Sequence, residues 1–325
     1  MPRPRKIHYH KAVLFVTMSI EEGLLLLCNP LLQTLLKSAL ARAQTLHPVK
    51  ICHFLFEATH VHMIVAVDNP DDVKGFAERF KTESAHYINR LLGRPKRTVW
   101  CDGYDSPVLL TAADVIDKIV YLYTNPAKDC LEDSIANYPG LSSWSMFEKG
   151  IHQKIWAWIP RNAVRSVKNQ YLTIKDCHAL AGEMLAKAHE QMSFKLEPNI
   201  WMDYMGIHST TVQAENNAKI VRCIKERENE YRKKRLAVHK GVVGKERLLR
   251  EQLDPGHQPD RKGRRMWCIC CDKELRRRFI SFIKELVLRA REVYKSWCMG
   301  NYNQPFPPGL YPPAMPKLVE PVMFW

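Results

Sequence analysis

Residues 49–67 read VKICHFLFEATHVHMIVAV, and this stretch decides the predicted fold. Its two runs rich in Val, Ile and Phe, 49–56 and 60–67, are separated by the short turn Glu57-Ala58-Thr59. Such runs around a turn predict two β-strands that follow each other in the chain. Upstream, residues 12–19 predict another strand, and leucines at helical spacing after Asn29-Pro30 predict a helix between the first and second strands.

The signals downstream of residue 67 complete a regular pattern. A helix is predicted over residues 70–93, short strands over 98–101 and 107–110, and a third helix from Thr111 to Asn125, where Pro126 is expected to end it. The order strand, helix, strand, strand, helix, strand, followed by a further helix, is the split βαβ pattern. The sequence therefore predicts an α+β fold, a ferredoxin-like antiparallel sheet with helices packed on it.

The second half of the chain has a different composition, with helix formers and charged residues dominating from about Arg165. Helices are predicted over residues 175–192, 215–239 and 273–297. We expect a first domain of residues 1–150, a mostly helical and basic accessory region of residues 165–300, and a proline-rich tail of residues 301–325. Such a tail is expected to wrap the surface in extended form or to remain mobile.

The charge balance points to a polyanionic partner. Lys and Arg total 49 against 34 acidic residues, which gives a net charge of +15 and a pI near 9.4. Each phosphate that a basic side chain neutralises releases a counterion, so nucleic acid is the leading partner, with a membrane surface as the weaker alternative. The apolar run 12–19 lacks a small-residue cleavage site, and residues 23–36 are too short to span a membrane.

The ten cysteines are mostly scattered singly, which favours reduced thiols in a cytoplasmic protein. Cys268, Cys270 and Cys271 form the one tight group in the sequence. A zinc site would need a second ligand pair at a suitable spacing, and the sequence has none nearby. This group is therefore expected to be small hydrophobic residues on a strand.

His60 and His62 are the first candidates for chemistry. Side chains alternate between the two faces of a strand, so both imidazoles point the same way and Val61 points the other way. Two imidazoles in this relation can share a divalent ion. A His-x-His motif on a strand is as often incidental as functional. Residues of the third predicted helix decide which interpretation is favoured here.

In that helix, Tyr121 falls in a polar stripe that burial does not explain. At 100° per residue, its side also carries Asp114, Asp117, Lys118 and Asn125. The opposite, apolar side includes Tyr123, which is expected to be a core residue. An exposed phenol beside cations and a metal ligand is the setting that a nucleophilic tyrosine needs. We therefore predict Tyr121 as nucleophile, with Asn125 one turn later as a third, oxygen ligand beside His60 and His62.

These parts predict phosphoryl-transfer chemistry on nucleic acid. An ion held by imidazole and carboxamide ligands, with Mg²⁺ or Mn²⁺ the best suited, would polarise the scissile phosphate. Attack by Tyr121 would give a phosphotyrosine link that the reverse step can pass to a new strand. Lys118 is either a phosphate contact or a solvated surface lysine.

The same residues carry a resemblance. His60-Val61-His62 after a strand, together with YLYTNPAK at residues 121–128, resembles the REP-associated tyrosine transposases, single-tyrosine members of the HUH endonuclease superfamily. YPGLSSW at residues 138–144 and the segment from Trp100 to Tyr104 are also similar, and the similarity covers roughly residues 10–144. The family often has Pro-Asn before its first histidine, where this chain has Ala58-Thr59.

The resemblance implies an HUH nuclease fold with His60 and His62 as metal histidines, Asn125 as third ligand and Tyr121 as nucleophile. It implies a transposase, a metal-dependent endonuclease and strand transferase that acts on single-stranded DNA with a hairpin or palindromic repeat. We expect a monomer or homodimer with no membrane partner. Tyr104, in a turn between polar neighbours, remains a rival nucleophile without a helically spaced ligand.

Basic residues flank the predicted site and are expected to contact the nucleic acid: Arg79, Lys81, Arg90, Arg94, Lys96 and Arg97. Tyr87 and Trp100 lie among them, either as surfaces on which unpaired bases stack or as core aromatics, and the core is favoured for Trp100. Runs of basic residues near 232–235 and 276–278 either track a hairpin backbone or are simply solvated.

Two other functions stay open. One is a catalytically inactive protein that binds hairpin DNA or RNA on the same fold, against which the retention of His60, His62, Tyr121 and Asn125 argues. The other is a nickase like a relaxase or replication initiator, against which the short chain and single usable tyrosine argue.

Overall fold

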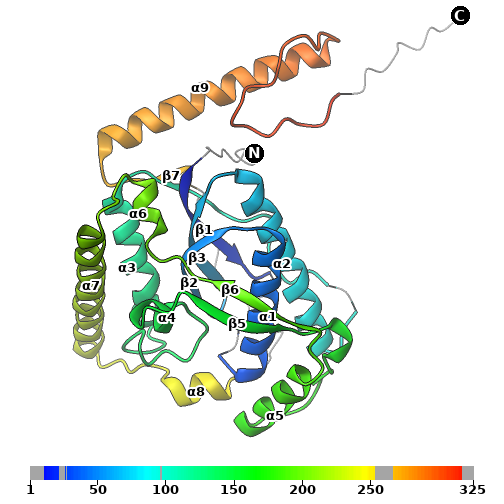
Figure 1. Cartoon of the computed structure of the whole chain (residues 1–325), viewed down its shortest axis with the longest axis vertical. Helices are drawn as coiled ribbons and strands as arrows, with labels where there is room; N and C mark the ends of the chain where they lie inside the picture. Colours follow the sequence, from blue (N-terminus) through cyan, green and yellow to red (C-terminus); the bar gives the residue numbers. More distant parts are fainter. Residues whose placement is uncertain (1–10, 22–25, 27, 96, 253–265, 317–325) are drawn as a thin grey trace, which may run out of the picture.

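The structure, a computed structural model, describes residues 11–21, 26, 28–95, 97–252 and 266–316. Its first half contains these elements: β1 (Ala12–Ser19), α1 (Pro30–Leu46), β2 (Lys50–Phe56), β3 (His60–Val67), α2 (Pro70–Leu91), β4 (Val108–Leu109) and α3 (Ala112–Lys128) (Figure 1). The sheet order is β2-β3-β1-β4-β7, and β1, β2, β3 and β4 pair antiparallel. This is the strand order of the split βαβ pattern. The predicted α+β fold is confirmed.

Helix starts follow the local sequence signals. The Asn29 side chain accepts a hydrogen bond from the Leu32 amide at the start of α1, where Pro30 holds the first helical position. A capping box links the Thr111 and Asp114 side chains to each other's backbone amides at the start of α3. These caps fix where α1 and α3 begin, and hence the direction in which α3 presents its side chains.

The predicted end of α3 at Asn125 was wrong. Pro126 lies inside the helix, which continues to Lys128. Proline removes one amide donor but does not prevent the next turn from closing, and the Asp129 amide donates to the Asn125 carbonyl at 2.9 Å. The extra turn places Lys128 seven residues, or about two turns, after Tyr121 on one side of the helix.

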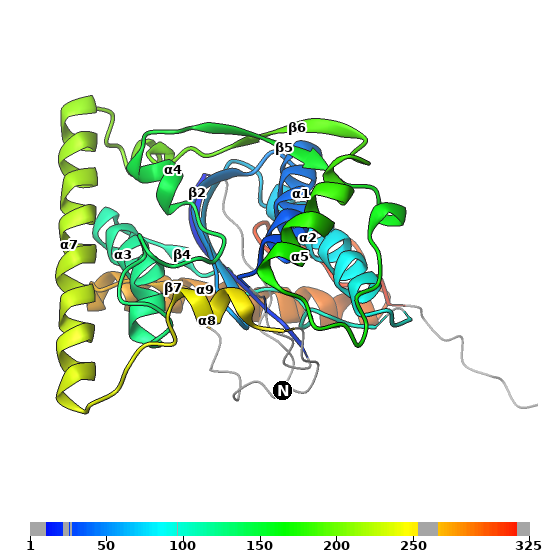
Figure 2. The same ribbon diagram turned by 90° about the horizontal axis from the view of Figure 1, so that it is seen from below.

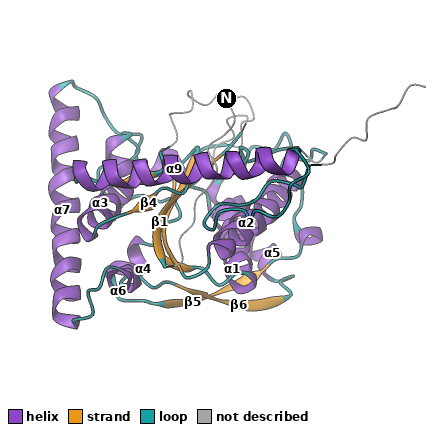
Figure 3. Ribbon diagram, turned by 90° about the horizontal axis from the view of Figure 1, so that it is seen from above, coloured by secondary structure: helices purple, strands orange, loops and turns teal. Residues whose placement is uncertain are grey.

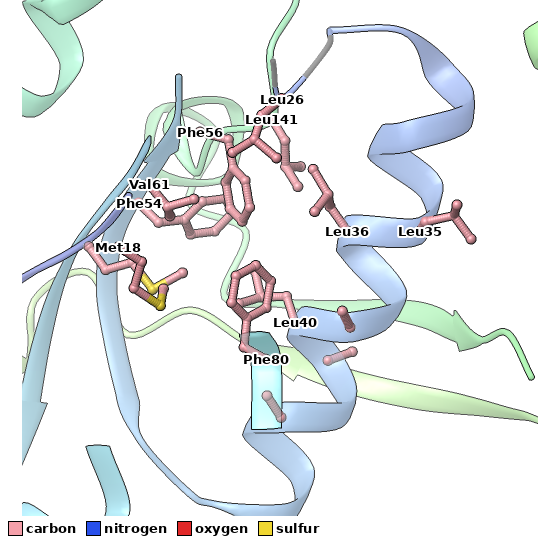
Figure 4. Close-up of a cluster of buried hydrophobic side chains, with 14 of the residues drawn as sticks. Met18, Leu26, Leu35, Leu36, Leu40, Phe54, Phe56, Val61, Phe80 and Leu141 are labelled. Atoms are coloured by element: carbon pink, nitrogen blue, oxygen red, sulfur yellow. The ribbon is translucent and has the colours of Figure 1, made fainter. Parts of the chain in front are cut away.

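The sheet separates two hydrophobic cores (Figure 2). On one face, β3 residues Val61, Met63 and Val65 join α1 and α2. Figure 4 shows part of this core, with Phe54 and Val61 of the sheet facing Leu40 of α1. On the other face, Ile64 and Ala66 of β3 pack under α3. Because His60 and His62 share the second face, they lie on the side of the sheet that α3 covers.

The second half adds further elements (Figure 3): α4 (Trp144–Glu148), β5 (Gln153–Trp158), a 3-10 turn (Arg161–Ala163), α5 (Ile174–Leu185), β6 (Glu190–Lys195), α6 (Ile200–Tyr204), α7 (Thr210–Ala237), α8 (Lys245–Arg250), β7 (Cys268–Ile269) and α9 (Lys273–Cys298). The long helix α7 packs along α3, and β7 joins the main sheet parallel to β4. Cys268 and Cys270 are buried there, while Cys271 is exposed.

The helix predicted over residues 175–192 was wrong in its second part. The helix ends at Leu185, and Glu190–Lys195 forms β6, which pairs antiparallel with β5 and packs on α1. Met192 and Phe194 are buried at two-residue spacing, and Phe194 stacks on Trp156 with ring centroids 4.2 Å apart. This cross-strand packing stabilises a strand where the local composition favours a helix.

The described part of the tail, residues 301–316, folds back along α9. The Trp297 indole donates to the Gln304 carbonyl at 3.0 Å, and Leu310 packs in a small core with Ile283 and Leu286. The Tyr311 hydroxyl donates to Asp71 at the start of α2. Over these residues the tail contains no helix and turns at Pro308-Gly309. No helix in the described ranges is long and apolar enough to cross a membrane.

Candidate active site

Two histidine rings of β3 form the centre of the site. Their ring centroids are 4.4 Å apart, and β3 pairs with β1 so that His60 lies opposite Ser19 and His62 opposite Thr17. His62 is 6% exposed and stacks on the Phe15 ring at a centroid distance of 5.0 Å. The strand register therefore fixes both imidazoles on the α3 side of the sheet.

The surroundings of His62 favour a neutral ring with one nitrogen free to bind a ligand. Its Nδ1 atom lies 3.0 Å from Thr17 Oγ1, and its Nε2 atom is buried with no hydrogen-bond partner in the part of the chain that the structure describes. Burial holds the pKa of His62 well below its ordinary value, and the nearby His60, Lys128 and Lys118 charges lower it further. With the proton on Nδ1, directed at Thr17, the lone pair of Nε2 faces the site.

Glu57 lies next to the two histidines, and its position there was not predicted from the sequence. This turn residue is 2% exposed, and its Oε2 atom lies 3.0 Å from His60 Nε2. Its Oε1 atom is buried and has no hydrogen-bond partner among the described residues. The other His60 nitrogen, Nδ1, lies 3.0 Å from Thr59 Oγ1. The signal that could have found Glu57 is its position, an acidic residue in the turn immediately before the histidine strand.

The three side chains suit a divalent metal ion. One ligand atom from each of Glu57, His60 and His62 lies within 4.8 Å of the others. Buried polar atoms without partners cost roughly 1–3 kcal/mol each, so Glu57 Oε1 and His62 Nε2 are costly unless something binds them. Two neutral imidazoles and a carboxylate are common ligands of divalent transition metals and Mn²⁺.

Tyr121 lies beside this cluster. Its ring centroid is 5.8 Å from that of His62 and 6.2 Å from that of Phe15. Two ammonium groups approach the same ring, Lys118 Nζ at 4.8 Å and Lys128 Nζ at 5.3 Å from its centroid. The phenol therefore lies on the same side of the sheet as both imidazoles, with two cations near its ring.

The Lys128 ammonium group interacts electrostatically with both Tyr121 and Glu57. Burial alone would lower the pKa of its ammonium group, but the nearby Tyr121, Asp129 and Glu57 side chains outweigh this effect and raise that pKa. Asn125 lies on α3 between Tyr121 and Lys128 and is 1% exposed. Within the described ranges, neither its amide nitrogen nor its amide oxygen has a hydrogen-bond partner. One side of α3 thus carries Lys118, Tyr121, Asn125 and Lys128 at successive turns.

The two other tyrosines considered are core residues. Tyr123 is fully buried, and its hydroxyl bonds to His53 Nδ1 at 2.9 Å and Ser143 Oγ at 2.8 Å. Burial raises the pKa of Tyr123 far above its ordinary value. Tyr104, the rival nucleophile, is buried in the core under α1 and α2, on the opposite side of the sheet from α3.

The predicted basic contacts on α2 are not brought to Tyr121, because α2 covers the opposite face of the sheet. Arg79 pairs with Glu83 at 2.8 Å, Lys81 donates to the Cys101 and Gly103 carbonyls, and Arg90 donates to the Val164 carbonyl. These charges hold parts of the protein together. Arg94 donates to Asn89, and Arg97 is exposed in the segment that follows α2. Lys96 lies outside the described residues.

The aromatic residues among these basic side chains are not stacking surfaces. Tyr87 is fully buried and donates to the Ile159 carbonyl at 2.6 Å. Trp100 is buried in the same core and donates to Ser84 Oγ at 2.9 Å.

Part of the chain is similar to known transposases. Residues 25–119 match the family model described as IS200-like transposase. The predicted resemblance to transposases is confirmed. The matching segment includes Glu57, His60 and His62 and ends two residues before Tyr121. The metal-ligand cluster thus lies within the transposase-like segment.

Among solved structures, the chain is similar to that of a REP-associated tyrosine transposase bound to a REP hairpin. The two share 18% identity with a TM-score of 0.39, and the alignment covers 47% of this chain and 88% of that chain. No curated protein matches the sequence.

Proposed function

We propose that this protein is a metal-dependent endonuclease and strand transferase that cuts and rejoins single-stranded DNA with Tyr121 as nucleophile. The observation that carries the proposal is the meeting of two elements far apart in the chain. The Tyr121 ring of α3 lies 5.8 Å from the His62 ring of β3. It is next to a cluster in which two buried ligand atoms, Glu57 Oε1 and His62 Nε2, have no hydrogen-bond partner among the described residues.

In this proposal His60, His62 and Glu57 hold a divalent ion, and the Asn125 amide supplies a further oxygen ligand. A bound Mg²⁺ or Mn²⁺ would supply polarisation of the scissile phosphate and neutralise its charge. Thr17 and Thr59 orient the two imidazoles through their Nδ1 atoms.

The protein's own groups then carry the transfer. The Tyr121 oxygen attacks phosphorus and loses its proton to solvent, and a bond forms between phosphorus and that oxygen. The bond from phosphorus to the neighbouring sugar oxygen breaks, and that oxygen leaves as a hydroxyl after it takes up a proton. Lys118 and Lys128, whose ammonium groups lie near the ring, hold the phosphate. Attack by a free hydroxyl on the phosphotyrosine reverses the step and joins strands.

We propose that residues 1–150 carry this chemistry, with residues 165–300 as a helical accessory region and 301–325 as a tail. Contacts between α7 and α3, including Arg227 with Asp117 at 3.1 Å, support a role of the accessory region in holding the tyrosine helix. The net charge of +15 supports a nucleic-acid substrate, and the motif resemblance supports a hairpin-containing one.

Incubation with short hairpin oligonucleotides and Mn²⁺ tests the proposal. We expect a protein–DNA band that survives denaturing electrophoresis and that does not form when EDTA is present from the start of the incubation. Binding without such a band, over oligonucleotides that vary in loop and flank, would instead support the catalytically inactive hairpin-binding function.

Thr17→Val is expected to weaken Mn²⁺ binding by about 10- to 100-fold, because it removes the oxygen that orients His62 while keeping the side-chain shape. Thr17→Ser keeps a hydroxyl and is expected to bind Mn²⁺ nearly as the wild type does. Calorimetric titration with Mn²⁺ measures both affinities. Equal affinities for Thr17→Val and Thr17→Ser would show that Thr17 does not orient the ligand.

A further inference from the structure

A second candidate binding site is a cavity of about 370 Å³ at the end of α2. Its walls come from the segment after α2, the loop before α5, and the end of α8. The apolar wall residues include Leu92, Leu172 and Leu249, and the basic ones are Arg94, Arg97 and Lys168. Cavities of this size bind small molecules or single groups of larger ligands.

The walls of the cavity are fixed by specific contacts. Gln252 both accepts from the Leu172 amide and donates to the Leu172 carbonyl, each at 3.0 Å, which ties α8 to the loop before α5. Gly93 ends α2 with φ +57°, and a Cβ there would lie 2.3 Å from Ser166 Oγ. Only glycine allows so close an approach of the two segments. The cavity is therefore a built feature of the fold.

Its chemistry fits an unpaired nucleotide. Three basic side chains against one acidic lining residue, Glu251, favour an anionic ligand such as a phosphate group. The leucine side chains offer an apolar wall for a flat base, and the exposed Asn169 and Gln170 offer donors and acceptors for its edge. A nucleotide combines all three properties in one molecule.

The cavity is connected to the proposed active site through two chains of contacts. The short helix α8 begins where the Val243 and Gly244 amides donate to the Cys130 and Leu131 carbonyls, just after Lys128, and its end lines the cavity. The six residues of α8 themselves span about 9 Å. Figure 2 shows α8 crossing from the α3 side of the sheet toward α5.

The second chain of contacts passes through the turn that carries Glu57. Cys28 is the chain neighbour of Asn29, which lines the cavity. Burial, together with the nearby Glu251 carboxylate of the cavity wall, raises the pKa of the Cys28 thiol to about 11. The Cys28 thiol contacts the Tyr138 hydroxyl, which donates to the Phe56 carbonyl immediately before Glu57. The cavity and the metal-ligand turn thus share neighbours.

We infer that the cavity bounded by Arg94, Arg97, Lys168 and Leu249 binds an unpaired nucleotide of the DNA strand that reaches Tyr121 along α8. The inference rests on the proposed function for its choice of a DNA strand. It assigns to this cavity the selection of the DNA segment next to the cleaved bond, a role separate from the chemistry itself.

The test is fluorescence anisotropy with a labelled 12-nucleotide single strand, in a Tyr121→Phe background that prevents covalent attachment. Lys168→Ala is expected to weaken binding about fivefold and to reduce the slope of log affinity against log salt by about one. Leu249→Trp, which fills the cavity, is expected to weaken it about tenfold, as loss of one stacked base would. Lys175→Ala, an exposed lysine on α5 outside the cavity, is the matched control and should bind unchanged.

The outcomes separate the two proposals. Unchanged binding by both Lys168→Ala and Leu249→Trp would overturn the cavity assignment whether or not wild-type protein forms the covalent adduct. If the two variants bind the strand more weakly but the wild type forms no adduct, the proposed function is refuted and the assignment of the cavity as a nucleotide site is supported. Thymidine 5′-monophosphate as competitor distinguishes the sources of a nucleotide: displacement of the strand at micromolar concentration would overturn the assignment to DNA. Lys168→Ala changes an exposed loop side chain, so it keeps the test decisive if Leu249→Trp does not fold.

Discussion

Replacement of Tyr121 by phenylalanine abolishes the covalent protein–DNA adduct, with an expected loss on the order of 10⁴-fold or more. The variant keeps the ring that lies against Phe15 and the two lysines but lacks the attacking oxygen. DNA binding is expected to stay within about twofold, and the free energy of unfolding within about 0.5 kcal/mol, because the side chain is partly exposed. Denaturing electrophoresis measures the adduct, and anisotropy measures the binding.

Tyr123→Phe is the matched control, two residues away on the same helix. It is expected to keep the adduct but to lose about 1–3 kcal/mol of stability, because His53 and Ser143 lose a buried partner. Both substitutions remove a phenol oxygen. We expect Tyr121→Phe to lose the adduct and keep its stability, and Tyr123→Phe to keep the adduct and lose stability. An adduct that persists in Tyr121→Phe and vanishes in Tyr104→Phe or Tyr123→Phe would show that the nucleophile is assigned to the wrong residue.

Most of the first half of the fold could be predicted because its signals are local. The strands around residues 57–59, the cap at Asn29 and the capping residue Thr111 each act within a few positions of the element they define. The same local periods placed His60 and His62 on one face and Tyr121 opposite Tyr123 on its helix. Because the apolar side of the third helix was expected to pack on the sheet, Tyr121 and His62 were expected to lie near each other.

The elements that were missed depend on partners distant in the chain. β5 and β6 stabilise each other across more than thirty residues through contacts such as Trp156 on Phe194, and local composition does not encode such pairing. β7 differs from these two, because the cysteine group at 268–271 was expected to lie on a strand. What the sequence did not reveal is its pairing partner, the two-residue strand β4 far away in the chain.

Glu57 and Lys128 were missed for different physical reasons. A turn residue has no period, and burial of Glu57 results from tertiary contacts around its turn, where the Leu26 amide donates to the Ala58 carbonyl. Lys128 was placed beyond the helix because Pro126 was expected to end it. The basic residues of α2 were instead given a role in DNA binding that the structure does not favour. The sequence alone does not show that Arg42, Arg79 and Arg161 all pair with Glu83.

Glu57→Gln is expected to weaken Mn²⁺ binding by at least about 100-fold, beyond the 10- to 100-fold typical for loss of an outer partner of a ligand. The amide keeps the shape of the side chain but removes the negative charge that offsets the charge of the ion. Glu132→Gln is the matched control, because Glu132 is also buried and lies outside the cluster of Glu57, His60 and His62. Calorimetric titration with Mn²⁺ compares the two variants.

Thermal unfolding separates a metal ligand from a structural carboxylate. A ligand that binds the folded state stabilises it by about 2.7 kcal/mol at 100 times its Kd, so the Tm of the wild type should rise with Mn²⁺ and that of Glu57→Gln should not. Without metal, the variant is expected to be at least as stable as the wild type, because the buried carboxylate has an oxygen with no partner. Asn125→Ala decides the remaining assignment. If it loses Mn²⁺ binding while Glu57→Gln keeps it, the amide is the third ligand and Glu57 serves only to pair with His60.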